Sequence, residues 1–315
     1  MKQIVPDYYP RFRCIAGACR HSCCIGWEID IDEDTLELYR SVGGDLGARL
    51  QANIDWNSET PHFILGDHDR CPFLNSDNLC DLIIGLGEEA LCGICDMHPR
   101  FCNEFSDRTE IGLGLSCEEA ARLILTTATP VQLICIEDDG EDTQPEEDEA
   151  YLYAMRRNAI AIAQDRTFTI KERMENLSDY FGFPLPKENP LYWAEAYMGL
   201  ERLDEGWTAA LETLKQAFVP KQFPLWENAF EQLLVYFLYR HCPTALYDGD
   251  LESKVAFAVL SVQMLMWLCE AKEDTDFADL LEFVRMYSGE IEYSDENPDA
   301  LFALLAADSD CPASD

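Results

Sequence analysis

The chain has 315 residues and a 48% hydrophobic composition, which is enough for one or two ordinary cores. Its 60 acidic and 23 basic residues give a formal net charge of −37, which argues against nucleic acid and anionic membrane as partners because both need Lys and Arg to neutralise phosphate. Residues 1–13 lack the apolar core of a signal peptide, and the longest apolar stretch, 255–269, is shorter than the ~20 residues of a membrane span. We therefore expect a cytoplasmic protein without a membrane span, in which residues 255–269 form a buried helix.

Short elements are predicted in the first 136 residues. Alternating apolar and acidic residues over 27–31 predict a short strand, and Asp32 or Asp34 is expected to cap the helix that follows. The pair Gly43 and Gly44 is expected to end this helix. The other expected elements are a helix over 46–54, an extended piece over 61–65, a helix over 79–91 that two glycines interrupt, a helix over 116–125 opened by a capping box, and a strand over 131–136.

An acidic segment over 137–149 divides the chain. It holds nine carboxylates and no basic residue, and so many like charges predict an exposed linker or loop, with docking of a basic partner as the alternative. The sequence that follows has helical periodicity, with prolines between the segments or at their ends. The candidate helices are 148–164, 170–180, 191–203, 205–218, 225–241, 251–271, 274–287 and 297–306.

These patterns together predict a mainly α protein. A cysteine-rich, metal-organised region with a few short strands is expected over 1–136, and the acidic linker over 137–149. An all-helical domain over 150–308 and a flexible tail over 309–315 are expected to follow. Aromatic residues at helical spacing in that domain are interpreted as core rather than as a cofactor site.

The cysteines carry the strongest chemical signal. Ten of the fourteen lie in the first 117 residues, at Cys14, Cys19, Cys23, Cys24, Cys71, Cys80, Cys92, Cys95, Cys102 and Cys117. Thiols this dense either form disulfides or hold a metal, and metal is the favoured interpretation because disulfides belong mainly to secreted chains. Cysteines separated by two to four residues let two thiolates converge on one ion, and four thiolates suit zinc or an iron–sulfur cluster.

Two adjacent cysteines, Cys23 and Cys24, are not expected to act alike. Side chains of neighbouring residues point apart, so one of the two faces a cluster while the other packs, pairs or binds a second ion. Outside the dense region, Cys135, Cys242 and Cys269 are interpreted as packed hydrophobic residues, and Cys311 lies in the acidic tail.

The cysteine spacing differs from two well-known cluster motifs. Radical S-adenosylmethionine enzymes use Cys-x3-Cys-x2-Cys, whereas here a cysteine directly follows Cys19-x3-Cys23, and the ferredoxin run Cys-x2-Cys-x2-Cys-x3-Cys-Pro does not occur. The sequence also has no phosphate-binding P-loop and no Gly-x-Gly-x-x-Gly. The catalytic residues and the residues that bind a nucleotide-like cofactor are therefore not assigned.

Four segments, 11–32, 71–83, 86–101 and 115–125, resemble in content and in order the flagellin lysine-N-methylase (FliB) family. That family overlaps the CxxCxxCC group of zinc- or iron-chelating domains, and the resemblance covers roughly residues 8–126. It implies a methyltransferase that moves methyl groups from S-adenosylmethionine to lysine ε-amines of flagellin, the protein of the bacterial flagellum. It also implies an iron–sulfur cluster of the 4Fe-4S type held by the cysteines, with zinc as the alternative metal.

The family pattern implies eight metal ligands, Cys14, Cys19, Cys23, Cys24, Cys71, Cys80, Cys95 and Cys117. Cys92 and Cys102 are ranked below them. The family's aromatic-Pro-Arg element is His98-Pro99-Arg100 here, and the histidine is a departure from it. His98 either binds a metal or packs in a turn, and Arg100 either contacts the cofactor carboxylate or pairs with an acid.

Three hypotheses for function follow. The favoured one is a protein-lysine N-methyltransferase acting on flagellin. The second is an iron–sulfur or zinc-binding module without transferase activity. The third is an interaction protein in which zinc merely folds the N-terminal half.

Overall fold

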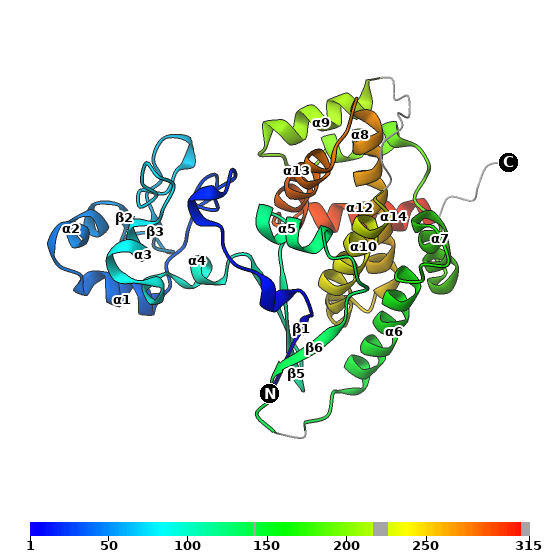
Figure 1. Ribbon diagram of the computed structural model, residues 1–315, viewed down its shortest axis with the longest axis horizontal. Helices are drawn as coiled ribbons and strands as arrows, with labels where there is room; N and C mark the ends of the chain where they lie inside the picture. Colours follow the sequence, from blue (N-terminus) through cyan, green and yellow to red (C-terminus); the bar gives the residue numbers. More distant parts are fainter. Residues whose placement is uncertain (141–142, 217–225, 310–315) are drawn as a thin grey trace. The chain divides into compact units, whose positions relative to one another are not determined.

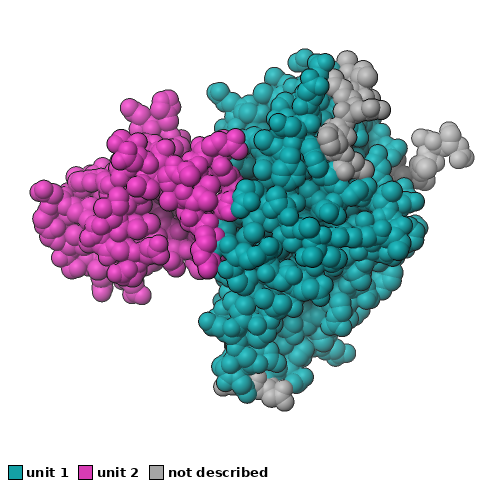
Figure 2. Space-filling view, viewed as in Figure 1, with its two compact units in different colours: residues 1–12, 102–116, 120–315 teal, residues 13–101, 117–119 magenta. Residues whose placement is uncertain are grey.

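The chain forms two compact units in this computed structural model, which describes residues 1–140, 143–216 and 226–309. Unit 1 contains residues 1–12, residues 102–116 and the chain from residue 120 onward, and unit 2 contains residues 13–101 and 117–119 (Figure 2). The structure therefore groups the chain differently from the predicted ranges 1–136 and 150–308. The physical reason is strand pairing, because the first residues of the chain pair with strands that follow residue 107.

A four-stranded sheet in unit 1 has the order β4-β5-β1-β6. Its strands are β1 (Lys2–Pro6), β4 (Arg100–Glu104, which begins in unit 2), β5 (Arg108–Leu113) and β6 (Leu133–Glu137). β1 runs parallel to β5, with Ile4 opposite Glu110, and antiparallel to β6, with Val5 opposite Ile134. Strand β6 confirms the prediction over 131–136, whereas β1, β4 and β5 were not predicted.

Helices make up the rest of unit 1 (Figure 1). They are η1 (Tyr9–Arg11), α5 (Glu118–Leu125, which begins in unit 2), α6 (Glu147–Ala163), α7 (Ile170–Phe181), α8 (Pro190–Met198), α9 (Glu205–Lys215), α10 (Glu227–His241), η5 (Cys242–Thr244), α11 (Ala245–Asp248), α12 (Leu251–Ala271), α13 (Phe277–Tyr287), the π-helix η6 (Ser288–Glu292) and α14 (Asn297–Ser309). Apart from Glu137, the last residue of β6, the described residues after 136 form helices and connections, as predicted. Residues 217–225 and 310–315, including parts of two predicted helices and Cys311, lie outside the described residues.

Helix α12 is the central core helix of unit 1. It packs against α7, α9, α10, α13 and α14, and most of its residues are buried. By length and composition alone it could cross a membrane, but 89% of its most apolar window is buried inside the protein. The prediction of a buried helix over 255–269 is confirmed.

The end of the acidic segment belongs to a helix, as the prediction over 148–164 indicated, and not to an exposed linker. Residues 137–140 are exposed, but Glu147 already begins α6, and Glu149 is buried. The Glu149 carboxylate accepts hydrogen bonds from the backbone N–H and the hydroxyl of Ser106 and from the N–H of Glu146. These bonds tie the end of the acidic segment to the β4–β5 turn.

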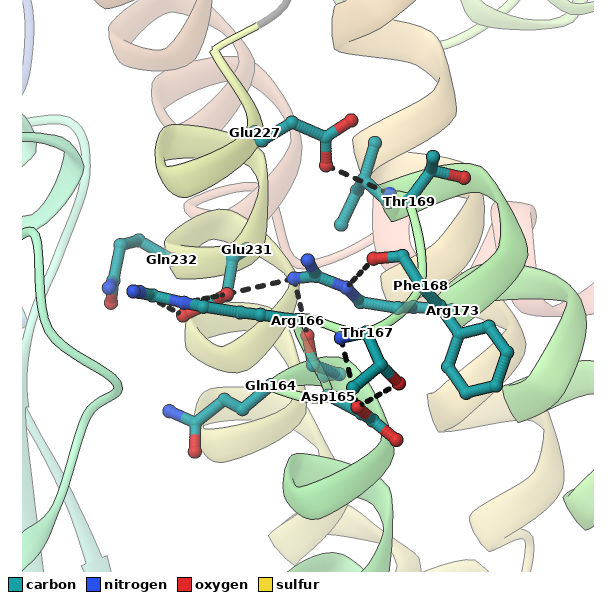
Figure 3. A network of polar contacts seen from close by, with 12 residues as sticks. Gln164, Asp165, Arg166, Thr167, Phe168, Thr169, Arg173, Glu227, Glu231 and Gln232 are labelled. Atoms are coloured by element: carbon teal, nitrogen blue, oxygen red, sulfur yellow. Dashed lines mark hydrogen bonds and ion pairs between the residues drawn. The ribbon is translucent and has the colours of Figure 1, made fainter.

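A buried ionic network joins the turn between α6 and α7 to α10 (Figure 3). The Glu231 carboxylate on α10 accepts two hydrogen bonds from Arg166, at 2.8 and 2.9 Å, and one from Arg173, at 2.8 Å. Gln232 donates to the carbonyl oxygens of Thr127 and Thr129. The network fixes the α6–α7 turn to the centre of unit 1.

Unit 2 consists of short elements around a small hydrophobic core. These are η2 (Ala16–Ala18), α1 (Glu33–Ser41), α2 (Gly44–Ala52), β2 (Ile54–Asp55), β3 (His62–Phe63), η3 (Asp67–Asp69), α3 (Asp81–Leu86), η4 (Glu88–Ala90) and α4 (Gly93–Met97). Asp32 caps α1 through the Thr35 N–H, as predicted, and α3 ends at Gly87, whose φ is 97°. The predicted strand over 27–31 is wrong: only Asp30 pairs, in an isolated bridge to His62, because the segment has no long partner strand.

Candidate metal centre

The predicted ligand cysteines all lie in unit 2. Cys14, Cys19, Cys23, Cys24, Cys71, Cys80, Cys92 and Cys95 are free thiols in the structure, and Cys117 joins unit 2 through residues 117–119. Cys102 belongs to unit 1, where it lies exposed on β4. The thiols of unit 2 form two groups, which differ in burial and in the residues around them.

The first group, called the surface set, contains Cys14, Cys19, Cys23 and Cys117. Glu118 anchors it: this carboxylate accepts hydrogen bonds from the N–H groups of Arg20 and His21, at 3.0 and 3.3 Å, and from the Cys19 thiol, at 3.8 Å. Because Cys117 precedes Glu118 in the chain, these contacts bring Cys117 to the loop that carries Cys19. Residues 117–119 are thereby held to a loop nearly one hundred positions earlier.

Electrostatic effects connect Cys19 and Cys23 with Cys14 and Cys117. Burial, Glu118 and the charges of Cys117 and Cys14 raise the pKa of Cys19 to about 11. The pKa of Cys23 is also raised, first because its thiol hydrogen-bonds to Cys24 and further by burial and by the charges of Cys14 and Cys117. Each thiol of this set is thus within electrostatic reach of at least one other member.

The second group, called the core set, contains Cys24, Cys71, Cys80, Cys92 and Cys95. Cys71 and Cys92 belong to the hydrophobic core of unit 2, and the other three pack against that core. Backbone contacts hold the set together: the Cys71 N–H donates to the Cys24 carbonyl oxygen at 2.8 Å, and Cys80 forms an isolated bridge with Leu74. Four chain segments therefore meet at these thiols.

Local helix geometry explains the placement of three core-set thiols. Cys92 precedes the first turn of α4 and Cys95 lies three residues later, so the two side chains share one face. Cys80 precedes α3 without a side-chain capping hydrogen bond, and burial raises the pKa of its thiol against the opposing effect of the Ile83 and Leu82 N–H groups. Backbone amides at a helix start favour a thiolate, which is the form that binds metal.

The core-set thiols also perturb one another. Burial raises the pKa of Cys71 to about 12, and the charges of Cys24, Cys80 and Cys92 add to this shift. The pKa of Cys24 is lowered to about 7, first by the hydrogen bond from Cys23 and further by Ser22 and Arg70, against the opposing effect of burial. A hydrogen bond from Cys95 lowers the pKa of Cys92. Cys24 and Cys92 are thus the two thiols of this set whose pKa is lowered.

The two sets are groups of neighbours rather than completed coordination spheres. Among the described residues, the trio whose donor atoms all lie within 4.8 Å of one another is Glu28, Asp30 and His62. Glu28 and Asp30 are exposed, and the His62 Nδ1 faces the Thr60 carbonyl oxygen at 2.9 Å. No trio of thiols in the described chain meets the same distance.

The aromatic-Pro-Arg element lies beside the thiols. The His98 ring packs on Trp27, with ring centroids 6.3 Å apart. Burial, with a further contribution from Arg100, lowers the pKa of His98 to about 4, so the ring is neutral at pH 7. Arg100 donates to the Asp96 carbonyl oxygen at 3.1 Å.

Cysteines outside the dense region have mixed environments. Cys242 and Cys269 are buried, as predicted, in unit 1. The prediction that Cys135 is packed is wrong, because β6 is an edge strand and all its residues are exposed.

Neither the cofactor site nor a catalytic base was predicted from the sequence. In unit 1, Pro6, Tyr8, Val131, Tyr236 and Tyr239 help line a cavity of about 20 Å³. That volume holds about one water molecule.

Cys92, which the sequence ranked below the other ligands, lies in the core of unit 2, and the contacts of Glu118 with the cysteine loop were not predicted. The Cys-x2-Cys spacing of Cys92 and Cys95 was the available signal for the first. Nothing local in the sequence marks Glu118, because its partners lie nearly one hundred residues away.

Comparisons with known proteins point to one family. The sequence model of the FliB lysine N-methylase C-terminal domain matches residues 187–312, in the helical part of unit 1. The resemblance seen in the sequence itself lies elsewhere, over 8–126. No solved structure is significantly similar.

Three curated relatives are similar over 137 residues, which is 40% of this chain. Lysine-N-methylases of Salmonella typhimurium and Salmonella choleraesuis are 32% and 31% identical, and the match spans 33% of each of their chains. The flagellar biosynthetic protein FliU of Salmonella muenchen is 31% identical over 79% of its length. The chain belongs to the FliB lysine N-methylase family.

Proposed function

We propose that the protein is a cytoplasmic lysine N-methyltransferase that uses S-adenosylmethionine to methylate flagellin, and that the cysteines of unit 2 hold an iron–sulfur cluster. Family membership is the observation that supports the activity, since two relatives are named lysine-N-methylases. Flagellin as substrate is supported by the flagellar name of the third relative. The match spans about a third of the two methylases, so activity and substrate are proposals for this chain.

The thiols of unit 2 fit a thiolate-bound metal. Both sets offer at least four sulfur donors, which is the number that a tetrahedral zinc site or a four-iron cluster uses. The ligands would come from Cys14, Cys19, Cys23, Cys24, Cys71, Cys80, Cys92, Cys95 and Cys117. A bound iron–sulfur cluster would supply one-electron redox chemistry or a Lewis-acidic iron.

Methyl transfer from a sulfonium to a lysine places clear demands on the protein. The methyl–sulfur bond breaks as the carbon–nitrogen bond forms, and the attacking amine must first lose its proton. A lysine has a pKa of about 10.4 in water, so a base or an apolar channel must favour its neutral form. The net charge of −37 would attract a lysine-bearing substrate before that step.

Metal identity is the first experiment. Protein purified without oxygen should be brown, absorb broadly near ~400 nm, and contain iron and acid-labile sulfide. Colourless protein with stoichiometric zinc would overturn the cluster and leave the donor set as a zinc site.

Methylation is the second experiment. Flagellin incubated with the metal-loaded protein and S-adenosylmethionine should gain mass in methyl increments on lysines, and flagellin from a strain lacking the gene should be lighter than that from its parent. Unchanged flagellin in both assays would refute the substrate.

The alternative is a metal-binding module without transferase activity. The partial coverage of the two methylases is the observation that favours it, because parts of those chains have no counterpart in the match. Calorimetric titration with S-adenosylmethionine separates the two: no binding to protein that still holds its metal would favour the module.

A further inference from the structure

We infer that β6 is the docking site for the protein substrate, which adds a strand of its own to the free edge of the sheet. The occupant is an extended segment of flagellin in which apolar residues lie next to a lysine. This inference rests on the proposed methylation of flagellin and goes beyond it, because it assigns the surface and the conformation in which the substrate is held.

Strand β6 has an unused edge. The order β4-β5-β1-β6 puts it at the end of the sheet, and among the described residues β1 is the strand that pairs with it. The Asp7 N–H donates to the Gln132 carbonyl oxygen at 2.8 Å, so Gln132 faces β1. In an antiparallel pair the direction alternates from one residue to the next, so the N–H and C=O groups of Leu133 and Cys135 point away from β1. These groups can pair with a further strand.

The side chains of β6 are apolar although they are exposed. Leu133, Ile134 and Ile136 are 41%, 36% and 41% exposed, and residues 133–136 include no charge and no proline. Natural edge strands commonly carry a lysine, a proline or a bulge that prevents pairing with another chain. The pairing of β6 with β1 shifts register only near its Glu137 end, so the apolar part of the edge is regular. It therefore has the properties of a pairing site.

Charge indicates which partner fits this edge. Glu137 ends the strand, and residues 137–149 hold nine carboxylates and no basic residue. Glu137 and Asp138 are exposed, so a lysine beside the paired segment of a substrate would meet negative charge there. A second copy of this chain fits less well, because two chains with a net charge of −37 repel each other.

Strand addition also suits a methylase of protein lysines. Main-chain hydrogen bonds give affinity for an extended segment, and the flanking side chains give specificity. Alternate side chains of an added strand point to opposite faces of the sheet, so the register of the pairing fixes where a lysine projects.

Amide hydrogen exchange in the full, metal-loaded chain is the first test, with and without monomeric flagellin. The outward N–H groups of Leu133 and Cys135 should exchange rapidly in the free protein and at least about tenfold more slowly when flagellin is bound. The Ile134 N–H faces β1 and serves as the internal reference, because it should be protected in both states.

Two substitutions at one position are the second test. Cys135→Pro removes an outward N–H, whereas Cys135→Ala keeps it, and both lack the thiol. The KM for flagellin of the Pro variant should exceed that of the Ala variant about five- to tenfold, with equal kcat, because a hydrogen bond of the docked segment is lost. If circular dichroism shows that Cys135→Pro does not fold, the exchange measurement on the unmodified protein decides.

The outcomes separate this inference from the proposed function. Flagellin that is bound and methylated without added protection at Leu133 and Cys135 would overturn the docking site and leave the methylase intact. Protection of these two amides that grows with protein concentration in the absence of flagellin would instead assign the edge to a second copy of the chain. Flagellin that the unmodified protein neither binds nor methylates would overturn the proposed function, and this inference with it.

Discussion

The Glu231 network offers the sharpest test of how unit 1 is held together. Glu231 is fully buried on α10 and accepts hydrogen bonds from Arg166 and Arg173. The Arg173 side chain is 4% exposed, whereas that of Arg166 is 37% exposed. Replacing Glu231 with Ala would therefore leave one buried guanidinium without its carboxylate and let the other turn to water (Figure 3).

The expected cost follows from burial. Removing one partner of a buried ion pair costs about 3–5 kcal/mol. Arg173 keeps hydrogen bonds to the carbonyl oxygens of Phe168 and Ala163, at 2.9 and 3.2 Å, so we expect the lower end of this range. A loss of about 3 kcal/mol corresponds to a drop of roughly 6–12 °C in the melting temperature of a domain of this size.

The assay is urea unfolding followed by tryptophan fluorescence. Four of the six tryptophans, Trp193, Trp207, Trp226 and Trp267, lie in unit 1, so the signal reports mainly on that unit. Glu175→Ala is the matched control, because Glu175 is an exposed carboxylate on α7. It should change the free energy of unfolding by less than about 0.5 kcal/mol.

A companion variant separates charge from packing. In the double variant Glu231→Met, Arg173→Met both buried charges of the pair are gone, so it should be more stable than Glu231→Ala. If Glu231→Ala unfolds at the same urea concentration as Glu175→Ala, the network does not stabilise the fold and the reasoning is refuted.

Three further predictions concern two buried polar groups and one helix cap. Glu110→Ala should lower the free energy of unfolding of unit 1 by about 3–5 kcal/mol in a urea titration. The reason is that it leaves the buried Arg156 guanidinium, which is 2.7 Å away and whose side chain is 3% exposed, without its carboxylate partner. Asp32→Ala should cost unit 2 about 1–2 kcal/mol in thermal unfolding, because its carboxylate caps α1 and also accepts from the Gly93 N–H at 2.8 Å. Burial lowers the pKa of His241, so its contribution to stability is present above the unfolded pKa of about 6.5 and is lost as the pH falls through the lower folded value. His241→Gln should therefore flatten the fall in unfolding free energy between about pH 7 and pH 5.

Each of these has a matched exposed residue as its control. Glu104→Ala on β4, Asp34→Ala beside the α1 cap and His68→Gln on η3 should each behave like the unmodified protein. A Glu110 variant as stable as its control would show that the ion pair is replaceable. An Asp32 variant that melts with the Asp34 variant, or a pH profile that His241→Gln leaves unchanged, would contradict the other two arguments.

The helices of unit 1 were predictable because their signals are local. Apolar residues repeat with helical period, and caps and prolines mark the ends, so the segment over 251–271 matches α12 residue for residue. The cap at Asp32 was predictable for the same reason. Strand β1 was not predictable, because its five residues become a strand only by pairing with β5 and β6, which lie more than one hundred positions away in the sequence.

For the cysteines, too, some features were predictable from the sequence and others depended on the tertiary structure. By itself, the sequence determined that the first 117 residues are rich in closely spaced thiols, because spacing is a property of neighbouring residues. Only the tertiary structure decided that Glu118 brings Cys117 to the Cys19 loop, and that Cys92 lies with Cys71 in the core against which Cys24 packs. These groupings depend on contacts between distant segments, which hydrophobic burial and hydrogen bonding establish only when the whole unit folds.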